Sequence, residues 1–387
     1  MRILTVSDSD SFLKWATATF EEVPADWRVR HLVLDNVIAP SAAQVAAVRG
    51  GFPTERGGVR RLVELAGGSG PAGRRPDAIV LACTGPALEV VMSVLARSGA
   101  LRARPGRPRP VLVGGLPGIS YPANDLAIRH RRDLDLMLLH SHREVAAYAE
   151  VVGRLGGPEL ALATLPFLAE VRRGLASAAP VRDRRAVVFA AQSLVPAAPA
   201  DRQRILTALE RLPTELDPVV KVRAVAGERQ AHNEAYPYQR LWAERPDHLR
   251  ELDFRAGRMA DALAGAYGFA TVSSTAAIEA IAAGVPSLVL GDFGVSAELI
   301  NLVFTDSGLI GTLDDLSAGR FRDPDPSWLR DNYFQPESDN TWRERLETLV
   351  QQRSALPPVR FRGLGGLLPQ ARRFLRLLPD PRNRSAG

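Results

Sequence analysis

The fold of this chain is decided by the stretch Thr271-Val-Ser-Ser-Thr-Ala-Ala-Ile-Glu-Ala-Ile-Ala-Ala-Gly-Val-Pro-Ser-Leu-Val-Leu-Gly291, in which an apolar strand, an alanine-rich helix and a second apolar strand follow one another. Three hydroxyl residues, 273–275, separate the first strand from the helix. Gly284 ends the helix, and Pro286 prevents its continuation. Because hydroxyl side chains and free backbone N–H groups gather at such a helix start, this junction predicts an anion-binding site.

The carboxylate inside this helix bears on the choice between ligand binding and simple helix capping. If Thr275 only capped the helix, a capping box would place Glu or Gln three residues later, where the chain has Ile278. Glu279 comes one position further on, where its carboxylate can reach ribose hydroxyls. We therefore predict that a nucleotide is bound by Ser273, Ser274, Thr275 and Glu279. Helix capping is the alternative interpretation.

Strand-like and helix-like patterns alternate along the whole chain. In the first half, strands are expected at 2–7, 28–35, 77–83, 110–115, 134–140 and 159–165. In the second half, strands are expected at 186–191, 218–224, 269–273 and 287–291, with helices that include 199–211, 239–266, 275–283 and 296–305. Such alternation is typical of βα units around parallel sheets. It predicts an α/β fold whose functional residues lie in loops directly after strands.

The pattern restarts after an Arg- and Ala-rich stretch at 171–185, which divides the chain. We expect an N-terminal acceptor-side domain over 1–175 and a C-terminal donor-binding domain over 176–350. A basic tail follows over 351–387. Two interpretations of the tail stay open: a helix that crosses back to the first domain, or a basic surface, residues 360–384, that rests on anionic lipid.

Composition is typical of a soluble globular protein. The 387 residues are 46% hydrophobic and 24% charged, without an apolar run of the length that spans a membrane. The N-terminus predicts a strand rather than a signal peptide, and the single cysteine, Cys83, lies in a buried-strand pattern. We therefore expect a cytoplasmic protein, peripheral on the inner membrane face if the tail binds lipid. The net charge of +6 resides in 357–387, so the basic balance does not predict nucleic-acid binding.

The order of strand, Ser-Ser-Thr, alanine-rich helix with an internal Glu, Gly-Val-Pro and strand resembles the donor-binding region of GT-B glycosyltransferases. Within that class it looks most like bacterial sialyltransferases, polysialyltransferases and related capsule enzymes, in which a Ser-Ser/Thr pair holds the phosphate of a CMP-sugar. The segments 291–294 and 296–301 fit the loop and helix that close this region. The whole chain also resembles a group of actinobacterial proteins described as glycosyltransferases.

This resemblance implies two Rossmann-like domains that face a central cleft, with the donor nucleotide bound by the C-terminal one. It implies transfer of a CMP-activated nonulosonic (sialic-type) acid to a glycan or lipid-linked acceptor. The chain departs from the family pattern, because the strand Val219-Val-Lys-Val-Arg223 lacks the His-Pro pair of those enzymes. Lys221 and Arg223 are expected to neutralise a phosphate or sugar carboxylate there. The alternatives are a UDP-sugar, GDP-sugar or CDP-glycerol donor and, in another class, a non-catalytic nucleotide-binding partner of an envelope-glycan complex.

Further candidates follow the first strand of each half. Gln192 and Ser193 are expected to touch the donor, with turn formation before Pro196 as the alternative. In the first half, Asp10 is the expected general base, with Asp8 second, because glycosyl transfer with inversion needs a group that takes the acceptor's proton. Helix N-capping is the alternative role of these two carboxylates.

The remaining acceptor-side candidates are one lysine and two glycines. Lysine is rare in this Arg-rich chain, and Lys14 lies just after the first strand. Gly115 and Gly118 belong to a tight turn after another strand, and this turn lacks the GxGxxG pattern of a dinucleotide-dependent dehydrogenase. Asp133-Leu-Asp135 precedes a strand rather than following one, so we expect no metal and no cofactor. Developing phosphate charge would then be met by a helix dipole and basic side chains.

Overall fold

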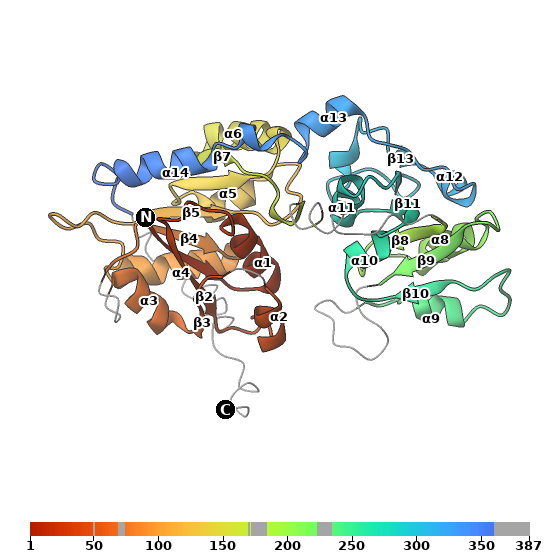
Figure 1. Ribbon diagram of the computed structural model, residues 1–387, viewed down its shortest axis with the longest axis horizontal. Helices are drawn as coiled ribbons and strands as arrows, with labels where there is room; N and C mark the ends of the chain where they lie inside the picture. Colours follow the sequence, from red (N-terminus) through yellow and green to blue (C-terminus); the bar gives the residue numbers. More distant parts are fainter. Residues whose placement is uncertain (49–50, 69–73, 169–170, 172–183, 223–233, 360–387) are drawn as a thin grey trace. The chain divides into compact units, whose positions relative to one another are not determined.

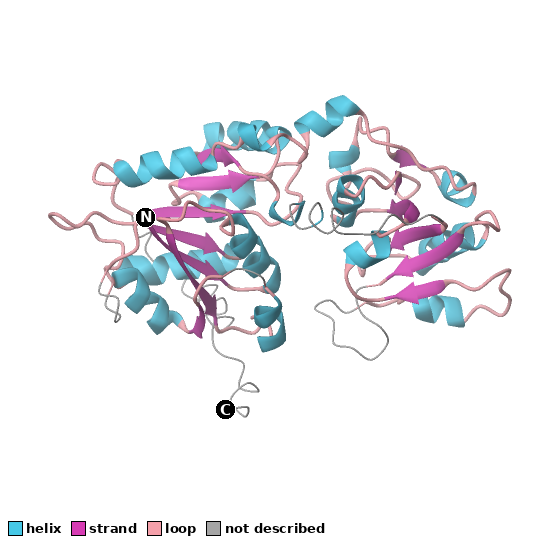
Figure 2. Cartoon of the chain, viewed as in Figure 1, coloured by secondary structure: helices cyan, strands magenta, loops and turns pink. Residues whose placement is uncertain are grey.

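The computed structural model describes residues 1–48, 51–68, 74–168, 171, 184–222 and 234–359. The chain folds into two compact units (Figure 1): Met1–Pro166 with Pro336–Gly387 form the first, and Phe167–Gln335 form the second. Each unit is built on one parallel β-sheet flanked by helices, as Figure 2 shows. The predicted α/β fold with two domains is therefore confirmed.

The sheet of the first unit has seven strands among the described residues, in the order β3-β2-β1-β4-β5-β6-β7, and all neighbouring strands are parallel. The strands are β1 (Arg2–Ser7), β2 (Arg28–Leu34), β3 (Thr54–Gly57), β4 (Ala78–Ala82), β5 (Val111–Gly115), β6 (Leu136–Leu139) and β7 (Glu159–Leu162). The helices are α1 (Asp10–Thr19), α2 (Ala42–Ala47), α3 (Val59–Gly67), α4 (Gly85–Arg97), α5 (Asp125–Arg131), α6 (His142–Leu155) and α14 (Trp342–Gln351).

Both faces of this sheet are covered, which explains why the central strand β4 is apolar throughout. Every residue of β4 is buried, as expected for a parallel strand between two layers of helices. Ile79 and Leu81 pack into the core that lies under α3 and α4. Val80 points to the opposite face, where it shares a core with Trp15 of α1 and Trp342 of α14. The C-terminal helix α14 is therefore part of the first unit's core.

The sheet of the second unit has six strands in the part of the chain that is described, in the order β10-β9-β8-β11-β12-β13, again all parallel. The strands are β8 (Ala186–Ala190), β9 (Asp217–Lys221), β10 (Asp253–Arg255), β11 (Ala266–Thr271), β12 (Ser287–Leu290) and β13 (Ile310–Gly311). The helices are α8 (Pro199–Glu210), α9 (Tyr238–Ala243), α10 (Met259–Leu263), α11 (Ala276–Ala282), α12 (Leu313–Ser317) and α13 (Pro326–Asp331), with a 3₁₀ turn at Leu302–Phe304.

The chain order reverses at one point in each sheet. In the first unit, β2 and β3 extend the sheet on one side of β1, whereas β4 to β7 extend it on the other. In the second unit, β9 and β10 lie on one side of β8, and β11 to β13 lie on the other. Parallel α/β sheets bind ligands at such reversals, beyond the carboxyl ends of the two central strands. The loops after β1 and β4, and after β8 and β11, are therefore where a site is expected.

The structure differs from the sequence prediction at several elements. Residues 336–350, expected in the C-terminal domain, belong to the first unit, because the ring of Trp342 packs edge-on against Phe20 and Trp27. The helix that returns to the first unit is thus α14, which begins before the expected tail. Strand β10 lies inside a region expected to be helical, and residues 296–301 form turns instead of the expected helix.

Two of the predictions fall on parts of the chain that lie outside the described residues. These are the donor contact expected from Arg223 and the lipid contact expected from residues 360–384.

Candidate active site

Two buried polar atoms lack partners at the reversal point of the second unit. The Ser273 side chain is 5% exposed, and its Oγ has no hydrogen-bond partner among the residues that the structure describes. The same holds for Oε1 of Gln192. Phe189 of β8 pairs with Ala270 of β11, and Gln192 and Ser273 each follow the end of one of these two neighbouring strands. Because buried polar groups are normally hydrogen-bonded, two such atoms at a ligand edge indicate groups that a ligand would satisfy.

Lys221 ends β9, the strand on the other side of β8. It is level with Ala190, the last residue of β8, and is 6% exposed. Its Nζ donates to the carbonyl of Val222 at 3.0 Å. Burial lowers the pKa of Lys221, and the negative charges of Glu279 and Asp261 partly oppose that shift. A compact ammonium group therefore lies at the edge that also carries Ser273, and its contact with a donor stays a prediction.

The three predicted hydroxyl residues have different environments. Oγ of Ser274 accepts a hydrogen bond from the backbone N–H of Ala276 at 3.1 Å, so this side chain caps the start of α11. Thr275 is exposed and makes no capping bond through its side chain. Glu279 lies half-buried in the first turn of α11. Ser273 is thus the member of the triplet whose hydroxyl is buried and has no partner within the described residues, so it could bind a ligand. Ser274 has the role that was the alternative interpretation, helix capping.

A buried asparagine fixes the loop that follows β12. Asn301 donates through Nδ2 to the carbonyl of Gly294 at 3.0 Å and to that of Val272 at 3.4 Å. Its Oδ1 accepts from the backbone N–H of Ser296 at 2.9 Å. The side chain therefore ties the loop after β12 to the end of β11, directly beside Ser273.

A buried arginine, which the sequence analysis missed, organises the loop after β8. Arg202 of α8 is 1% exposed, and its guanidinium lies 4.9 Å from the ring centre of Tyr238. All its N–H groups have acceptors. These are the carbonyls of Pro196 (2.8 Å), Tyr236 (2.7 Å), Gln192 (3.2 Å) and Ser193 (2.7 Å) and the carboxylate of Glu234. Arg202 therefore holds the backbone of Gln192 and Ser193, the two candidate residues of this loop. Because it binds them through their backbone carbonyls, no sequence pattern reveals the contact.

In the first unit, Asp8 follows β1 and is fully buried. Its Oδ2 accepts hydrogen bonds from the backbone N–H and the hydroxyl of Thr84, which follows β4. Its Oδ1 is buried and finds no partner within the described parts of the chain. Burial raises the pKa of Asp8, although the bonds from Thr84 act in the opposite direction. Asp8 thus connects the two strands at the reversal point, and its side chain is not open to solvent.

Asp10 and Lys14, both predicted for the acceptor side, form an ion pair. Asp10 begins α1, and its Oδ2 accepts from Nζ of Lys14, one turn later, at 2.7 Å. The two side chains are 30% and 61% exposed. Of the two candidate bases, Asp10 is therefore the more exposed, although its Oδ1 is buried. Neither carboxylate forms the predicted alternative, a side-chain cap, since Ser9 occupies the N-cap position.

Gly115 allows close packing at the end of β5. A Cβ atom there would lie 2.3 Å from Cζ2 of Trp15 and 3.1 Å from the carbonyl oxygen of Leu138. Trp15 donates through Nε1 to Nε2 of His140 at 2.7 Å, so the bare backbone of Gly115 keeps a buried hydrogen bond in place. Gly118, in the turn that follows, has a φ of +85°, a left-handed conformation that glycine adopts readily.

No group of three or more His, Cys, Asp or Glu side chains that could hold a metal ion occurs among the described residues. The metal-free mechanism stays a prediction. Within the same residues, no helix combines the length and the apolar character needed to cross a membrane.

Comparison with known protein families assigns the chain to one of them. A model of the family described as "Putative glycosyltransferase (DUF6716)" matches residues 3–349. The chain belongs to this family. The DUF6716 assignment agrees with the predicted enzyme class, glycosyltransferase. No curated protein is significantly similar to the chain.

Several solved structures share the architecture of this DUF6716 member. Arabidopsis thaliana UGT89C1, solved with quercetin, is 12% identical, with a TM-score of 0.54 over 91% of this chain and 99% of its own. A UDP-N-acetylglucosamine 2-epimerase from Listeria monocytogenes is 12% identical, with a TM-score of 0.54 over 93% of this chain and 92% of its own. The UDP-GlcNAc 2-epimerase of Neisseria meningitidis, bound to UDP-GlcNAc, is 11% identical, with a TM-score of 0.52 over 91% of this chain and 100% of its own.

At this identity the similarities show the fold, which is the predicted GT-B fold of two Rossmann-like domains. The family match and these structures do not show the resemblance to sialyltransferases that the Ser-Ser-Thr motif suggested, and the CMP donor stays a prediction.

Proposed function

We propose that the protein transfers a sugar from a nucleotide-activated donor whose phosphate lies at the carboxyl edge of the second unit's sheet. The observation that carries this proposal is the pair of buried atoms without partners, Ser273 Oγ and Gln192 Oε1, at the reversal point of that sheet. A donor would satisfy both, since a hydroxyl donates to a phosphate oxygen and an amide oxygen accepts from a base or a ribose hydroxyl. The family assignment supports the same class of reaction.

Charge at this edge suits a phosphate group. The Lys221 ammonium supplies a compact positive charge, and Glu279 offers a carboxylate that can accept from ribose hydroxyls. As the bond between sugar and phosphate breaks, negative charge grows on the leaving phosphate. A positive charge fixed in a partly buried site stabilises that charge more than water does. This arrangement supports a reaction that uses no metal and no further cofactor.

For the donor we propose a UDP-activated sugar. The Neisseria meningitidis structure with the same fold holds UDP-GlcNAc, and the chain lacks the His-Pro pair of the CMP-dependent enzymes. A CMP-activated nonulosonic acid is the second candidate, because the Ser-Ser-Thr sequence at 273–275 favours it. The acceptor that we propose is a glycan or lipid-linked glycan.

On the acceptor side we propose Asp10 as the general base and Asp8 as a positioning residue. Asp10 is the accessible carboxylate, and its ion pair with Lys14 orients it. Asp8 is buried and holds Thr84 at the end of the neighbouring strand. A general base must reach the proton that it removes, which favours Asp10.

Nucleotide binding tests the donor site directly. We expect UDP to raise the melting temperature of the protein more than CMP, CDP or GDP does, because a ligand that binds only the folded state stabilises it. Ser273→Ala should weaken nucleotide binding about fivefold through loss of one hydrogen bond, with little change in stability. Ser317→Ala, which removes a hydroxyl from α12 of the same unit, is the control and should bind as the wild type does. Absence of any nucleotide effect, or an unchanged affinity in Ser273→Ala, would overturn the proposed site.

Turnover separates an enzyme from a non-catalytic binding protein. Release of nucleotide from the donor that binds best should be followed with an extract of bacterial envelope glycans as acceptor. We expect Asp10→Asn to lower this release by about 100-fold while nucleotide affinity is kept. Asp26→Asn, an exposed carboxylate of the same unit, should leave both properties unchanged. Tight binding with no release under any acceptor would favour the non-catalytic alternative.

A further inference from the structure

The amino edge of the first unit's sheet, opposite the edge that carries Asp8, presents a hairpin with two arginines. Arg104 and Arg107 face each other across a two-residue turn, and each backbone N–H donates to the other's carbonyl at 2.9 Å. Gly106 in this turn has a φ of +67°. Both arginine side chains are exposed. Like charges directly opposite each other on paired strands repel, so this arrangement costs stability unless an anion lies nearby.

A third arginine lies beneath the hairpin with unused donors. Arg75 is 9% exposed, and its Nη1 donates to the carbonyls of Arg102 at 3.0 Å and Pro108 at 3.2 Å, one on each arm of the hairpin. Its Nε and Nη2 are buried and have no partner in the described regions. A buried guanidinium with three unused N–H groups, one on Nε and two on Nη2, is costly, since each unsatisfied donor has lost its water.

The charges of Arg104 and Arg107 act on Arg75, and the Arg107 side chain reaches the Arg75 backbone. A Cβ placed on Gly68 would lie 2.6 Å from the backbone N of Arg75 and 2.9 Å from Nη2 of Arg107, so the Arg107 side chain passes directly over the start of Arg75. Arg107 also donates to the carbonyl of Gly67 at the end of α3, at 2.8 Å. Burial, followed by the positive charges of Arg107 and Arg104, lowers the pKa of Arg75 to about 10.

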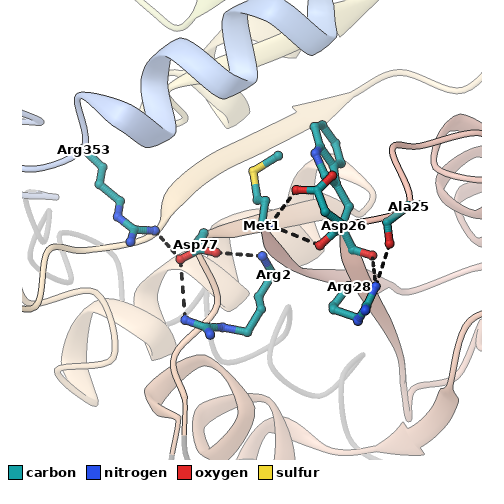
Figure 3. Close-up of polar contacts among 8 residues, drawn as sticks. Met1, Arg2, Ala25, Asp26, Arg28, Asp77 and Arg353 are labelled. Carbon is teal, nitrogen blue, oxygen red and sulfur yellow. Dashed lines mark hydrogen bonds and ion pairs between the residues drawn. The ribbon is translucent and has the colours of Figure 1, made fainter.

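Two carboxylates of this edge, Asp77 and Asp135, are already engaged by other arginines. Asp77 accepts from the backbone N–H of Arg2 at 2.7 Å and pairs with Arg353 at 2.5 Å, as Figure 3 shows. Asp135 binds both terminal nitrogens of Arg109, each at 2.7 Å. No ion pair involving Arg75, Arg104 or Arg107 occurs among the described residues. The positive charge of the hairpin is therefore not balanced within this part of the protein.

A cavity borders the same place and brings further positive charge. It has a volume of ≈ 420 Å³, and Gly68, which lies against Arg107, forms part of its lining. Four arginines also line it: Arg2, Arg28, Arg30 and Arg74.

We propose that Arg75, Arg104 and Arg107 form a binding site for a phosphate-type oxyanion, separate from the donor site in the second unit. The two exposed guanidiniums bind the anion from the solvent side, and Arg75 adds a fixed positive charge and the three N–H groups of Nε and Nη2 beneath it. Guanidinium groups suit this ligand because their N–H pairs match the spacing of phosphate oxygens. The anion has two sources, free phosphate or the phosphate of a lipid headgroup.

Calorimetric titration of the full chain with inorganic phosphate at low ionic strength tests the site. We expect binding to the wild type and a loss of affinity of about tenfold or more in Arg104→Gln/Arg107→Gln, in which two charge-assisted contacts are removed. The control Arg132→Gln/Arg211→Gln removes the same charge from two exposed positions elsewhere and should bind as the wild type does. Ser273→Ala should also keep phosphate binding at the hairpin, which separates this site from the donor site.

Vesicle flotation distinguishes the two sources of the anion. Binding to phosphatidylglycerol vesicles but not to phosphatidylcholine vesicles, lost in the hairpin variant, would assign the lipid headgroup. Phosphate binding without vesicle binding would assign the free anion. Failure of phosphate and vesicles to bind the wild type would overturn the proposal. So would equal affinities of the wild type and the hairpin variant, or equal losses in the hairpin and control variants.

Discussion

Oδ2 of Asp8 accepts a hydrogen bond from the backbone N–H of Thr84 at 2.9 Å and a second from its hydroxyl at 2.5 Å. These bonds join the ends of β1 and β4, the two strands between which the chain order of the first sheet reverses. The carboxylate therefore fixes the position of the loop that precedes α4 relative to the loop that leads into α1. Because Asp10 lies at the start of α1, the proposed base depends on this connection.

Substitutions of Asp8 should separate its hydrogen bonds from its charge. Asp8→Ala removes the acceptor of Thr84, and we expect a loss of about 2 kcal/mol in the free energy of unfolding. Asp8→Asn keeps an acceptor oxygen and removes the charge whose burial raises the pKa of Asp8. Urea unfolding near pH 7 should therefore find Asp8→Asn at least as stable as the wild type.

The difference in stability between the wild type and Asp8→Asn should depend on pH, because the pKa of Asp8 is raised in the folded state. With a raised pKa in the folded state, the stabilising contribution of protonated Asp8 is present below its unfolded pKa near 3.8 and is lost as the pH rises through the folded pKa. The advantage of Asp8→Asn should therefore shrink as the pH falls toward 4. An Asn variant as unstable as the Ala variant would contradict this account.

His31 should make the protein sensitive to mild acid. The buried ring lies between two hydroxyls of β1, with Nδ1 2.5 Å from Thr5 Oγ1 and Nε2 2.9 Å from Ser7 Oγ, and burial lowers its pKa from 6.5 to about 4. Its neutral form stabilises the fold above the unfolded pKa, and this contribution is lost as the pH falls toward the folded pKa. Between about pH 8 and pH 5 we expect His31 to account for a loss of about 2 kcal/mol.

The matching measurement compares urea unfolding of wild type and His31→Asn at both pH values. The variant should lose less stability on acidification than the wild type does. His142→Asn, which removes an exposed histidine, should behave like the wild type. Parallel pH dependence of wild type and His31→Asn would show that another group is responsible.

Arg202→Met should loosen the loop that carries Gln192 and Ser193. The substitution removes the hydrogen bonds that the guanidinium gives to the carbonyls of Gln192 and Ser193, and it leaves the Glu234 carboxylate without its partner. We expect a loss of about 3 kcal/mol in stability, together with weaker nucleotide binding by the protein that remains folded. Arg204→Met, on the same helix but 52% exposed, should change neither property. Nucleotide affinity equal to that of the wild type would remove Arg202 from the positioning of the donor loop.

Gly115→Ala should disturb the packing beneath the first unit's carboxyl edge. Its methyl group would force Trp15 away from its position and weaken the hydrogen bond to His140. We expect a cost of about 1–3 kcal/mol, the range for overpacking of a tight core. Thermal unfolding measures it, with Gly153→Ala as the control because a Cβ there meets nothing within 4 Å. An unchanged melting temperature would show that the tryptophan can move freely.

Much of the fold could be predicted because buried parallel strands are continuous apolar runs. The observed β1 coincides with the strand expected at 2–7, and the buried β4 lies within the one expected at 77–83. The edge strands β3 and β10 were missed, because Thr-Glu-Arg-Gly and Asp-Phe-Arg have exposed polar residues and no apolar run. The location of α14 was also missed, since an amphipathic helix does not reveal which domain it covers.

The candidate site was predicted in part. The sequence located the polar residues at strand ends, because the pattern of strand followed by loop shows which edge they share. The sequence could not distinguish Ser273 from Ser274. Only the three-dimensional structure shows that Ser274 caps the helix and that Ser273 does not. Arg202 gave no signal at all, because it binds mostly backbone carbonyls, which are the same whatever the residue.

The way in which the first unit is completed has a consequence for how the protein is made. Its core needs Trp342 and Leu346, which leave the ribosome after the whole second unit, since that unit is the continuous segment Phe167–Gln335. During synthesis the second unit can therefore complete its core while the core of the first unit still lacks helix α14. A nascent chain of which the residues up to 335 have emerged from the ribosome should display a finished second unit, together with a first unit that still exposes Phe20 and Trp27.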